Sequence, residues 1–124
     1  MAADAGIEFD SLILRNGLYY RPFSNSPYSG LALYSGLRGG DLLNGLMDGL
    51  WTTRHPNGLK IMEGEYRKGV QVGVWTSWNE EGRKVIEGEY KDGEREGRWT
   101  WWDENEQKSM EAEYRNGVLV DSHC

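Results

Sequence analysis

The sequence repeats itself at an interval of 24 residues, and this repetition constrains the fold more than any other feature. The tryptophans Trp51, Trp75 and Trp99 are each separated by 24 positions. The same interval relates Gly49, Gly73 and Gly97; Gly64, Gly88 and Ala112; Tyr66, Tyr90 and Tyr114; and Gly45, Gly69, Gly93 and Gly117. A unit this short cannot bury an apolar face alone, so neighbouring units must stack to close a continuous core. The chain is therefore predicted to be a linear array.

Each complete unit contains two turns. The first is a dipeptide ending in glycine, a pair typical of two-residue hairpins because glycine adopts positive φ readily. Its copies are Lys68-Gly69, Asp92-Gly93 and Asn116-Gly117. The second turn carries Gly58 and then Gly82, but the third copy has Glu106 there, which predicts a different turn.

The segments between these turns alternate apolar and polar residues with period two, the pattern of half-buried strands. No stripe of helical spacing is present. The sequence therefore predicts an all-β fold, an elongated antiparallel meander of tandem β-hairpin repeats that forms a single twisted sheet.

The unit boundaries follow from the register of the columns. Complete repeats span residues 49–72, 73–96 and 97–120. A degenerate, shorter repeat spans 26–48, because Gly30 lies only 19 residues before its counterpart Gly49. Residues 1–25 are predicted to form N-terminal cap strands, one or two of them over 7–21 with a turn at Asn16-Gly17, and 121–124 form a C-terminal tail. Terminal units of arrays are often atypical because they cover an exposed edge.

Alternation also assigns the two faces of the sheet. Met62, Gly64 and Tyr66 share one face. Because Gly64 has no side chain, we expect an aromatic ring from the adjacent strand to lie against its backbone. The opposite face carries an acidic ladder, formed by Glu63, Glu65, Glu87, Glu89, Glu111 and Glu113. We expect the charges of Arg67, Lys91 and Arg115 to offset its repulsion.

The tryptophans divide between these faces. The regular column of Trp51, Trp75 and Trp99 is typical of a core. Trp78 and Trp102 alternate onto the opposite face, and the matching position of the preceding unit is Arg54. A column that exchanges Trp for Arg is typical of a rim or an interface, where both residue types are enriched. The candidate partner-binding residues are Arg54, Trp78, Trp102, Glu63, Glu65, Glu87 and Glu89; for the glutamates, the alternative is a plain solvated face.

Composition excludes several classes of function. The net charge of −6 and pI of about 4.9 give no basic surface for nucleic acid and disfavour anionic lipid, whereas they suit a basic protein partner. His55 and His123 have no companions at catalytic or metal-ligand spacing, so no catalytic, cofactor-binding or metal-binding residue is predicted. Without a signal-peptide or membrane-spanning pattern, we expect a soluble cytoplasmic protein. The single cysteine, Cys124, allows no internal disulfide, and its redox fate stays open.

Residues 62–69 and 86–93 resemble the MORN repeat, in which a Gly-Glu-aromatic strand runs into a charged glycine turn. The continuation Gly73-Val74-Trp75 and the 24-residue period are similar to the bacterial variant, often labelled antitoxin-like. The resemblance implies single-sheet arrays that hold complexes together, sometimes dimerise, and are linked to phospholipids. It predicts a non-enzymatic protein-interaction or scaffolding module, such as an accessory subunit of a larger complex. The alternatives are a peripheral phospholipid-binding protein, an antitoxin or immunity-type neutraliser, and self-association through sheet edges.

Overall fold

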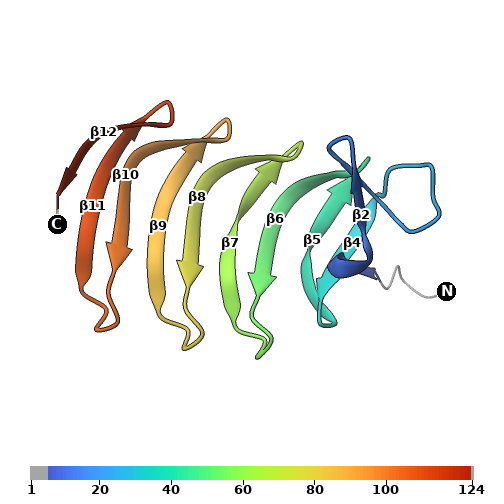
Figure 1. The fold of residues 1–124 in the computed structure, drawn as a ribbon, viewed down its shortest axis with the longest axis horizontal. Helices are drawn as coiled ribbons and strands as arrows, with labels where there is room; N and C mark the ends of the chain where they lie inside the picture. The colour runs from blue at the N-terminus through green and yellow to red at the C-terminus, as the bar shows by residue number, and fades with distance from the viewer. Residues whose placement is uncertain (1–5, 124) are drawn as a thin grey trace.

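A computed structural model describes residues 6–123 of the chain. The expectations for Cys124 and for the first five residues of the cap lie outside this range. The described chain forms one extended sheet of ten strands in the order β1-β4-β5-β6-β7-β8-β9-β10-β11-β12, and a separate two-stranded sheet of β2 and β3. Figure 1 shows the strands of the large sheet side by side along the long axis of the molecule, without closure into a barrel.

The predicted antiparallel meander is confirmed from β4 onwards, because each strand pairs with the strands before and after it in sequence. The strands are β4 (Gly30–Tyr34), β5 (Leu37–Leu43), β6 (Leu46–Arg54), β7 (Lys60–Arg67), β8 (Val70–Trp78), β9 (Lys84–Lys91), β10 (Glu94–Trp102), β11 (Lys108–Arg115) and β12 (Val118–His123).

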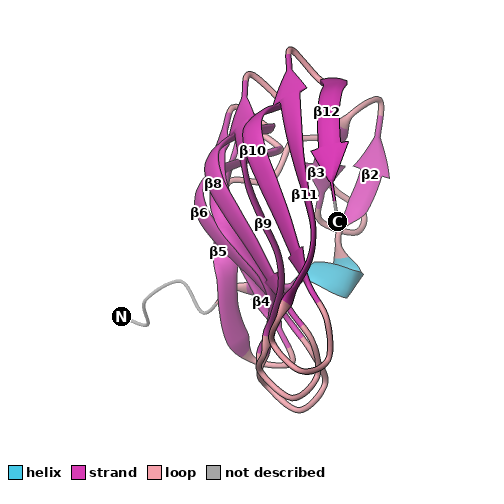
Figure 2. Cartoon of the chain, turned by 90° about the vertical axis from the view of Figure 1, so that its left-hand side faces the viewer, coloured by secondary structure: helices cyan, strands magenta, loops and turns pink. Residues whose placement is uncertain are grey.

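The N-terminal segment departs from the prediction of one or two strands within a single antiparallel sheet. It contains β1 (Ile7–Glu8), a 3₁₀ turn η1 (Phe9–Ser11), β2 (Ile13–Arg15) and β3 (Leu18–Tyr20). β1 pairs with β4 in parallel, while β2 and β3 form their own hairpin. Figure 2 shows η1 and this hairpin on one side of the large sheet. The reason is packing, since Phe9, Leu12 and Tyr19 lie against the core cluster around Trp51 rather than extending the sheet edge.

The two-residue turns have the backbone geometry that their sequences predict. Lys68, Asp92 and Asn116 have φ of 51°, and the glycines that follow have φ of 81°, 86° and 82°. Two positive φ angles define the type I′ turn, whose twist matches that of the flanking strands. Ser35-Gly36 forms the same turn between β4 and β5, where later units have the five-residue loop of residues 55–59. This exchange explains most of the shortness of segment 26–48.

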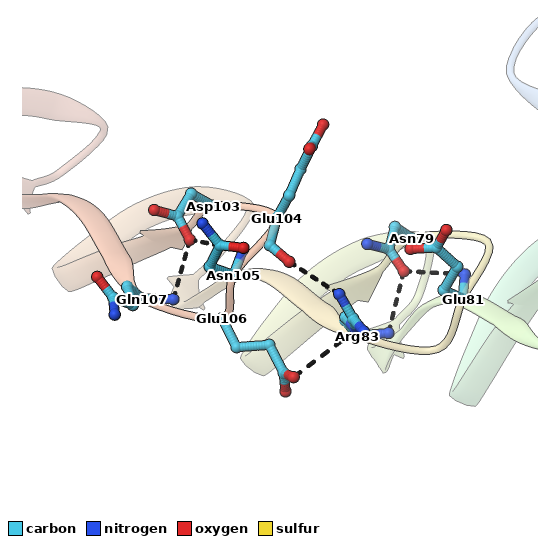
Figure 3. A network of polar contacts seen from close by, with 8 residues as sticks. All are labelled: Asn79, Glu81, Arg83, Asp103, Glu104, Asn105, Glu106 and Gln107. Carbon is cyan, nitrogen blue, oxygen red and sulfur yellow. Dashed lines mark hydrogen bonds and ion pairs between the residues drawn. The ribbon is translucent and has the colours of Figure 1, made fainter.

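The third long loop keeps the geometry of the other two, so the prediction of a different turn at Glu106 is wrong. Glu106 adopts φ of 62°, and its N–H donates to the Asp103 carbonyl at 3.0 Å, as Gly82 donates to Asn79 at 3.0 Å. Figure 3 shows the contacts that hold this loop: the Asp103 Oδ1 atom accepts hydrogen bonds from the N–H groups of Asn105 and Gln107, as Asn79 Oδ1 does in the preceding loop. The left-handed backbone costs a non-glycine residue about 1–2 kcal/mol.

The core is a ladder of aromatic rings on one face, which we call the aromatic face. Trp51, Trp75 and Trp99 are 2%, 4% and 3% exposed. The ring of Trp75 lies on Gly64 so closely that a Cβ at Gly64 would stand 2.0 Å from a ring carbon, and Trp99 covers Gly88 in the same way. Tyrosines fill the spaces between the tryptophans edge to face, at centroid distances of 5.0–6.3 Å. The predicted slot is therefore confirmed.

Candidate functional site

The candidate site is the opposite face of the large sheet, which we call the carboxylate face. Along β8, Trp78 lies on this face because it is three residues after the core residue Trp75, and Trp102 has the same relation to Trp99 on β10. Both side chains are half-buried. The described N-terminal segment covers only the aromatic face, because Phe9 contacts Trp51 there (Figure 2). The carboxylate face between β6 and β11 therefore has no covering segment within residues 6–123.

Four of the six glutamates of the predicted acidic ladder form ion pairs within residues 6–123: Glu63, Glu87, Glu111 and Glu113. Glu63 accepts a hydrogen bond from the Thr52 hydroxyl at 2.6 Å and an ion pair from Lys60 at 3.1 Å. Glu87 is held in the same way by Thr76 at 2.9 Å and by Lys84 at 3.3 Å. These two glutamates therefore hold neighbouring strands together.

The compensating cations differ from those we predicted. They are Arg98, which pairs with Glu111 and Glu113, and the three lysines Lys60, Lys84 and Lys108, each three residues before a ladder glutamate. Arg67, Lys91 and Arg115 form no ion pair within residues 6–123, so their predicted role is wrong. Each lysine and its glutamate lie on the same strand, on either side of a shift in the pairing register. Arg67, Lys91 and Arg115 lie instead at the other end of these strands, beside the hairpin turns. The lysines are themselves 24 residues apart, a signal that the sequence contains.

The electrostatics of Glu63 reflect this internal role. Burial raises the pKa of the Glu63 carboxyl, but hydrogen bonds from Thr52 and Lys60 and the charges of Lys60 and Arg54 outweigh it. The net result is a pKa below the ordinary glutamate value. Thr52 is only 7% exposed, so its hydroxyl depends on Glu63 as its acceptor.

The other two candidate glutamates have carboxylates without a partner in the described part of the chain. The carboxylates of Glu65 and Glu89 are exposed and form no ion pair or hydrogen bond within residues 6–123. Each lies opposite an exposed aliphatic residue on the neighbouring strand, Leu50 at 60% and Val74 at 61% exposed. The same pair, a free carboxylate opposite an exposed aliphatic side chain, therefore occurs in two successive repeats.

Trp78 and Arg54 lie together in one hollow, whereas Trp102 lies in another. The first hollow has a volume of about 400 Å³ and is lined by Arg54, Gly58, Leu59, Lys60, Trp78 and Gly82. The Lys60 Nζ atom stands 5.6 Å from the centre of the Trp78 ring. The second hollow, of about 230 Å³, is lined by Lys84, Trp102 and Glu106, with Lys84 at 5.4 Å from the Trp102 ring.

The long loops that border these hollows are tied to one another. Figure 3 shows Arg83 donating to the Glu104 carbonyl at 2.9 Å and pairing with the Glu106 carboxylate at 3.6 Å. In the preceding pair of loops, Asn57 donates to the Glu80 carbonyl at 3.1 Å. The three long loops are therefore linked to one another along the edge of the sheet, where they border both hollows.

One further cluster was not predicted from the sequence. On the aromatic face, the Arg95 guanidinium lies 4.5 Å from the Trp99 ring centre and 5.2 Å from that of Tyr114, and it donates to the Tyr114 hydroxyl at 3.0 Å. Trp101 joins the same cluster. The only signal is that Arg95 replaces Met47 and Gln71 of the preceding units, and nothing in the sequence shows that it stacks.

No three His, Cys, Asp or Glu side chains of the described chain converge on a common point in the manner of a metal site. Nor does any helix of residues 6–123 have the length and apolarity needed to cross a bilayer.

Residues 95–116, which comprise most of β10, the loop and β11, match the family model described as MORN repeat variant. No curated protein and no solved structure matches the chain. The matched strand-loop-strand unit recurs in β6–β7 and β8–β9 with the same pairing of Trp51 with Gly64 and of Trp75 with Gly88. The matched unit and its structural copies are thus similar to the MORN repeat variant.

Proposed function

We propose that this chain is a non-enzymatic protein-interaction or scaffolding module that binds its partner through the carboxylate face. A MORN repeat indicates an interaction or membrane-associated module. The observation that carries the proposal is the uncovered carboxylate face, which carries two half-buried tryptophans and two aliphatic side chains that are about three-fifths exposed. Exposed apolar groups rimmed by charges are typical of protein-binding surfaces.

The chemistry of the face favours a partner with basic groups. Glu65 and Glu89 lie two strands apart, a separation of about 10 Å at ordinary strand spacing. Leu50 and Val74 alternate with them along the array. A partner that presents Lys or Arg side chains about 10 Å apart with apolar groups between them would match both features. The net charge of −6 would steer such a partner towards the sheet.

Affinity capture with surface variants tests the proposal. The double variant Trp78→Ser/Trp102→Ser removes both aromatic groups from the carboxylate face. The matched control is Phe23→Ser, because Phe23 is fully exposed and lies outside the sheet. We expect a stoichiometric protein partner that binds the wild type and the control and is lost from the double variant. Retention of every partner by a folded double variant would show that the binding surface lies elsewhere.

The same capture separates the finer roles. An accessory subunit would be recovered with several proteins of one assembly, whereas an antitoxin or immunity-type neutraliser would be recovered with one protein whose activity it suppresses. We propose a cytoplasmic location for the complex, and fractionation of the source cells tests this proposal.

A peripheral phospholipid-binding role is the second candidate, and the MORN match favours it. The acidic charge opposes it, because anionic headgroups repel a chain of net charge −6. Flotation of the protein with anionic lipid vesicles at low salt decides between the two. We expect the protein to stay at the bottom of the gradient, and flotation would replace the protein-partner proposal with the lipid one.

A further inference from the structure

The hollow beside Trp78 has a lining unlike the rest of the carboxylate face. Its walls include the cations of Arg54 and Lys60, the Trp78 ring and the Leu59 side chain, and they include no carboxylate. Its volume of about 400 Å³ falls in the range of small-molecule and side-chain sites. Two cations around an apolar floor are notable in a chain whose net charge is −6.

Arg54 is the cation of this hollow without an ion-pair partner within residues 6–123, although its charge helps to lower the pKa of the Glu63 carboxyl. Its Nη1 atom donates to the Gly58 carbonyl at 3.0 Å, which fixes the guanidinium against the loop. Its Nε atom is shielded from solvent and has no acceptor within residues 6–123. No carboxylate of the described chain lies within ion-pair distance of Arg54. The guanidinium charge has no ion-pair partner there, and a carboxylate in the hollow would supply one through a charge-assisted hydrogen bond.

Lys60 adds a second donor at the same wall. It pairs with Glu63 at 3.1 Å, yet its side chain remains 43% exposed and its ammonium group has three protons to donate. The Nζ atom also stands over the Trp78 ring. An anion beside Trp78 would therefore meet Arg54 from one strand and Lys60 from the next.

The neighbouring unit provides an internal comparison. There, Trp78 occupies the position of Arg54, and Glu106 occupies the position of Gly82. The second hollow thus combines Lys84 and Trp102 with an acid, and it is smaller, at about 230 Å³. Of these two hollows, only the first has two cations and no carboxylate in its lining.

We propose that the Trp78 hollow binds a carboxylate joined to an apolar group. The apolar part would pack on Trp78 and Leu59, and the carboxylate would accept hydrogen bonds from Arg54 and Lys60. A peptide C-terminus ending in an aromatic or aliphatic residue has this chemistry, and so does a free aromatic acid. The site does not depend on the partner proposed above, because a free acid would occupy it without any protein partner.

Titration of the ¹⁵N-labelled protein with N-acetyl-L-phenylalanine tests the site by NMR. The indole N–H signals of Trp78 and Trp102 are assigned by their loss in Trp78→Ser and Trp102→Ser. We expect the Trp78 signal to shift and saturate at millimolar ligand, with little change at Trp102. The neutral analogue N-acetyl-L-phenylalanine amide should bind about tenfold more weakly, as expected when charge-assisted hydrogen bonds are lost.

Variants assign the binding to the two cations. Arg54→Met and Lys60→Met should each weaken binding of the carboxylate about tenfold without changing binding of the amide. Lys84→Met, the same substitution at the second hollow, should leave both affinities unchanged. The buried Trp75 indole signal reports whether each variant is folded, and Lys60→Met alone decides the matter if Arg54→Met disturbs that signal.

Three results would overturn the proposal: equal affinity for acid and amide, an equal shift at Trp102, or no saturable shift at Trp78. The source of the carboxylate is separated by a second ligand, the peptide acetyl-Gly-Gly-Gly-Phe with a free C-terminus. Tighter binding than N-acetyl-L-phenylalanine assigns the hollow to a peptide terminus, and equal binding assigns it to a free acid. Both outcomes support the apolar-carboxylate site.

Discussion

At the scale of single residues, the missing side chain of one glycine per unit decides how the array packs. Gly40, Gly64 and Gly88 each lie beneath a tryptophan ring, and a Cβ at any of them would stand 2.4 Å or less from a ring carbon. Ala112 occupies the fourth position of this series, and the next strand along the sheet, β12, contains no tryptophan and places Ser122 opposite it. Glycine is therefore required at this position of the repeat where the next strand carries a tryptophan.

Gly64→Ala tests this packing. The added methyl group collides with the Trp75 ring, which is 4% exposed and has no space to move. We expect the free energy of unfolding to fall by about 3 kcal/mol or more, the upper range for overpacking a core. The control is Gly73→Ala, where nothing lies within 4 Å and only the backbone at φ of 73° is strained. Chemical denaturation of both variants measures the difference, and equal effects would contradict the slot.

Glu63 makes the stability of the fold depend on pH. Because the pKa of Glu63 is lowered in the folded chain, its interactions stabilise the fold above the unfolded pKa. That stability is lost as the pH falls through the folded pKa. We expect Glu63→Gln to lower the free energy of unfolding by about 1 kcal/mol at neutral pH, the size of one hydrogen bond, and by much less in acid.

Glu65→Gln is the matched control for this pH dependence, because the Glu65 carboxylate has no hydrogen bond or ion pair within residues 6–123. Its stability should equal that of the wild type at both pH values. A constant deficit of Glu63→Gln from neutral to acid pH would show that the Glu63 charge does not contribute.

At the scale of strands and turns, repetition made the fold predictable. The alternation, the dipeptide turns and the slot at Gly64 each recur, and each is confirmed in the structure. Features that occur only once were not predictable. The parallel pairing of β1 with β4 and the placement of the β2–β3 hairpin over the core depend on contacts that Phe9 and Tyr19 make with residues far from them in sequence.

The candidate site was predictable only in part for the same reason. Alternation placed Trp78 and Trp102 opposite the core, but the hollows depend on which lysine reaches which ring. The role of Glu63 depends on Thr52 and Lys60, whose contacts cross an irregular strand pairing that the sequence does not mark. The separation of Glu63 and Glu87 from the free Glu65 and Glu89 is therefore a result of the structure.

Glu106→Gly tests the account of the long loops. Glycine removes the strain of a left-handed backbone, while the Arg83–Glu106 ion pair that is lost is exposed and contributes little. We expect thermal unfolding to show a stabilisation of up to about 1 kcal/mol. Ala112→Gly, a change to the same residue type in a strand that needs no positive φ, should instead destabilise by about 1 kcal/mol. A clear loss of stability in Glu106→Gly would mean that the ion pair with Arg83 dominates.

At the scale of the whole molecule, the sheet assigns its two faces to different tasks. One face holds the units together through the aromatic ladder, and the N-terminal segment closes it at the β4 end. The other face carries charged, aliphatic and aromatic groups that the packing of the array does not consume. This division lets a thin sheet contain six tryptophans, of which three are core residues and two, Trp78 and Trp102, lie on the carboxylate face.

The most direct test of this division is the free energy of unfolding of Trp75→Ser compared with that of Trp78→Ser. These tryptophans lie three residues apart on β8 and differ mainly in the face they occupy. We predict a loss of about 3–5 kcal/mol for Trp75→Ser, as for a large core residue, and about 1–2 kcal/mol for half-buried Trp78. Equal losses would mean that both faces are core, and the carboxylate face would then not be free to bind a partner.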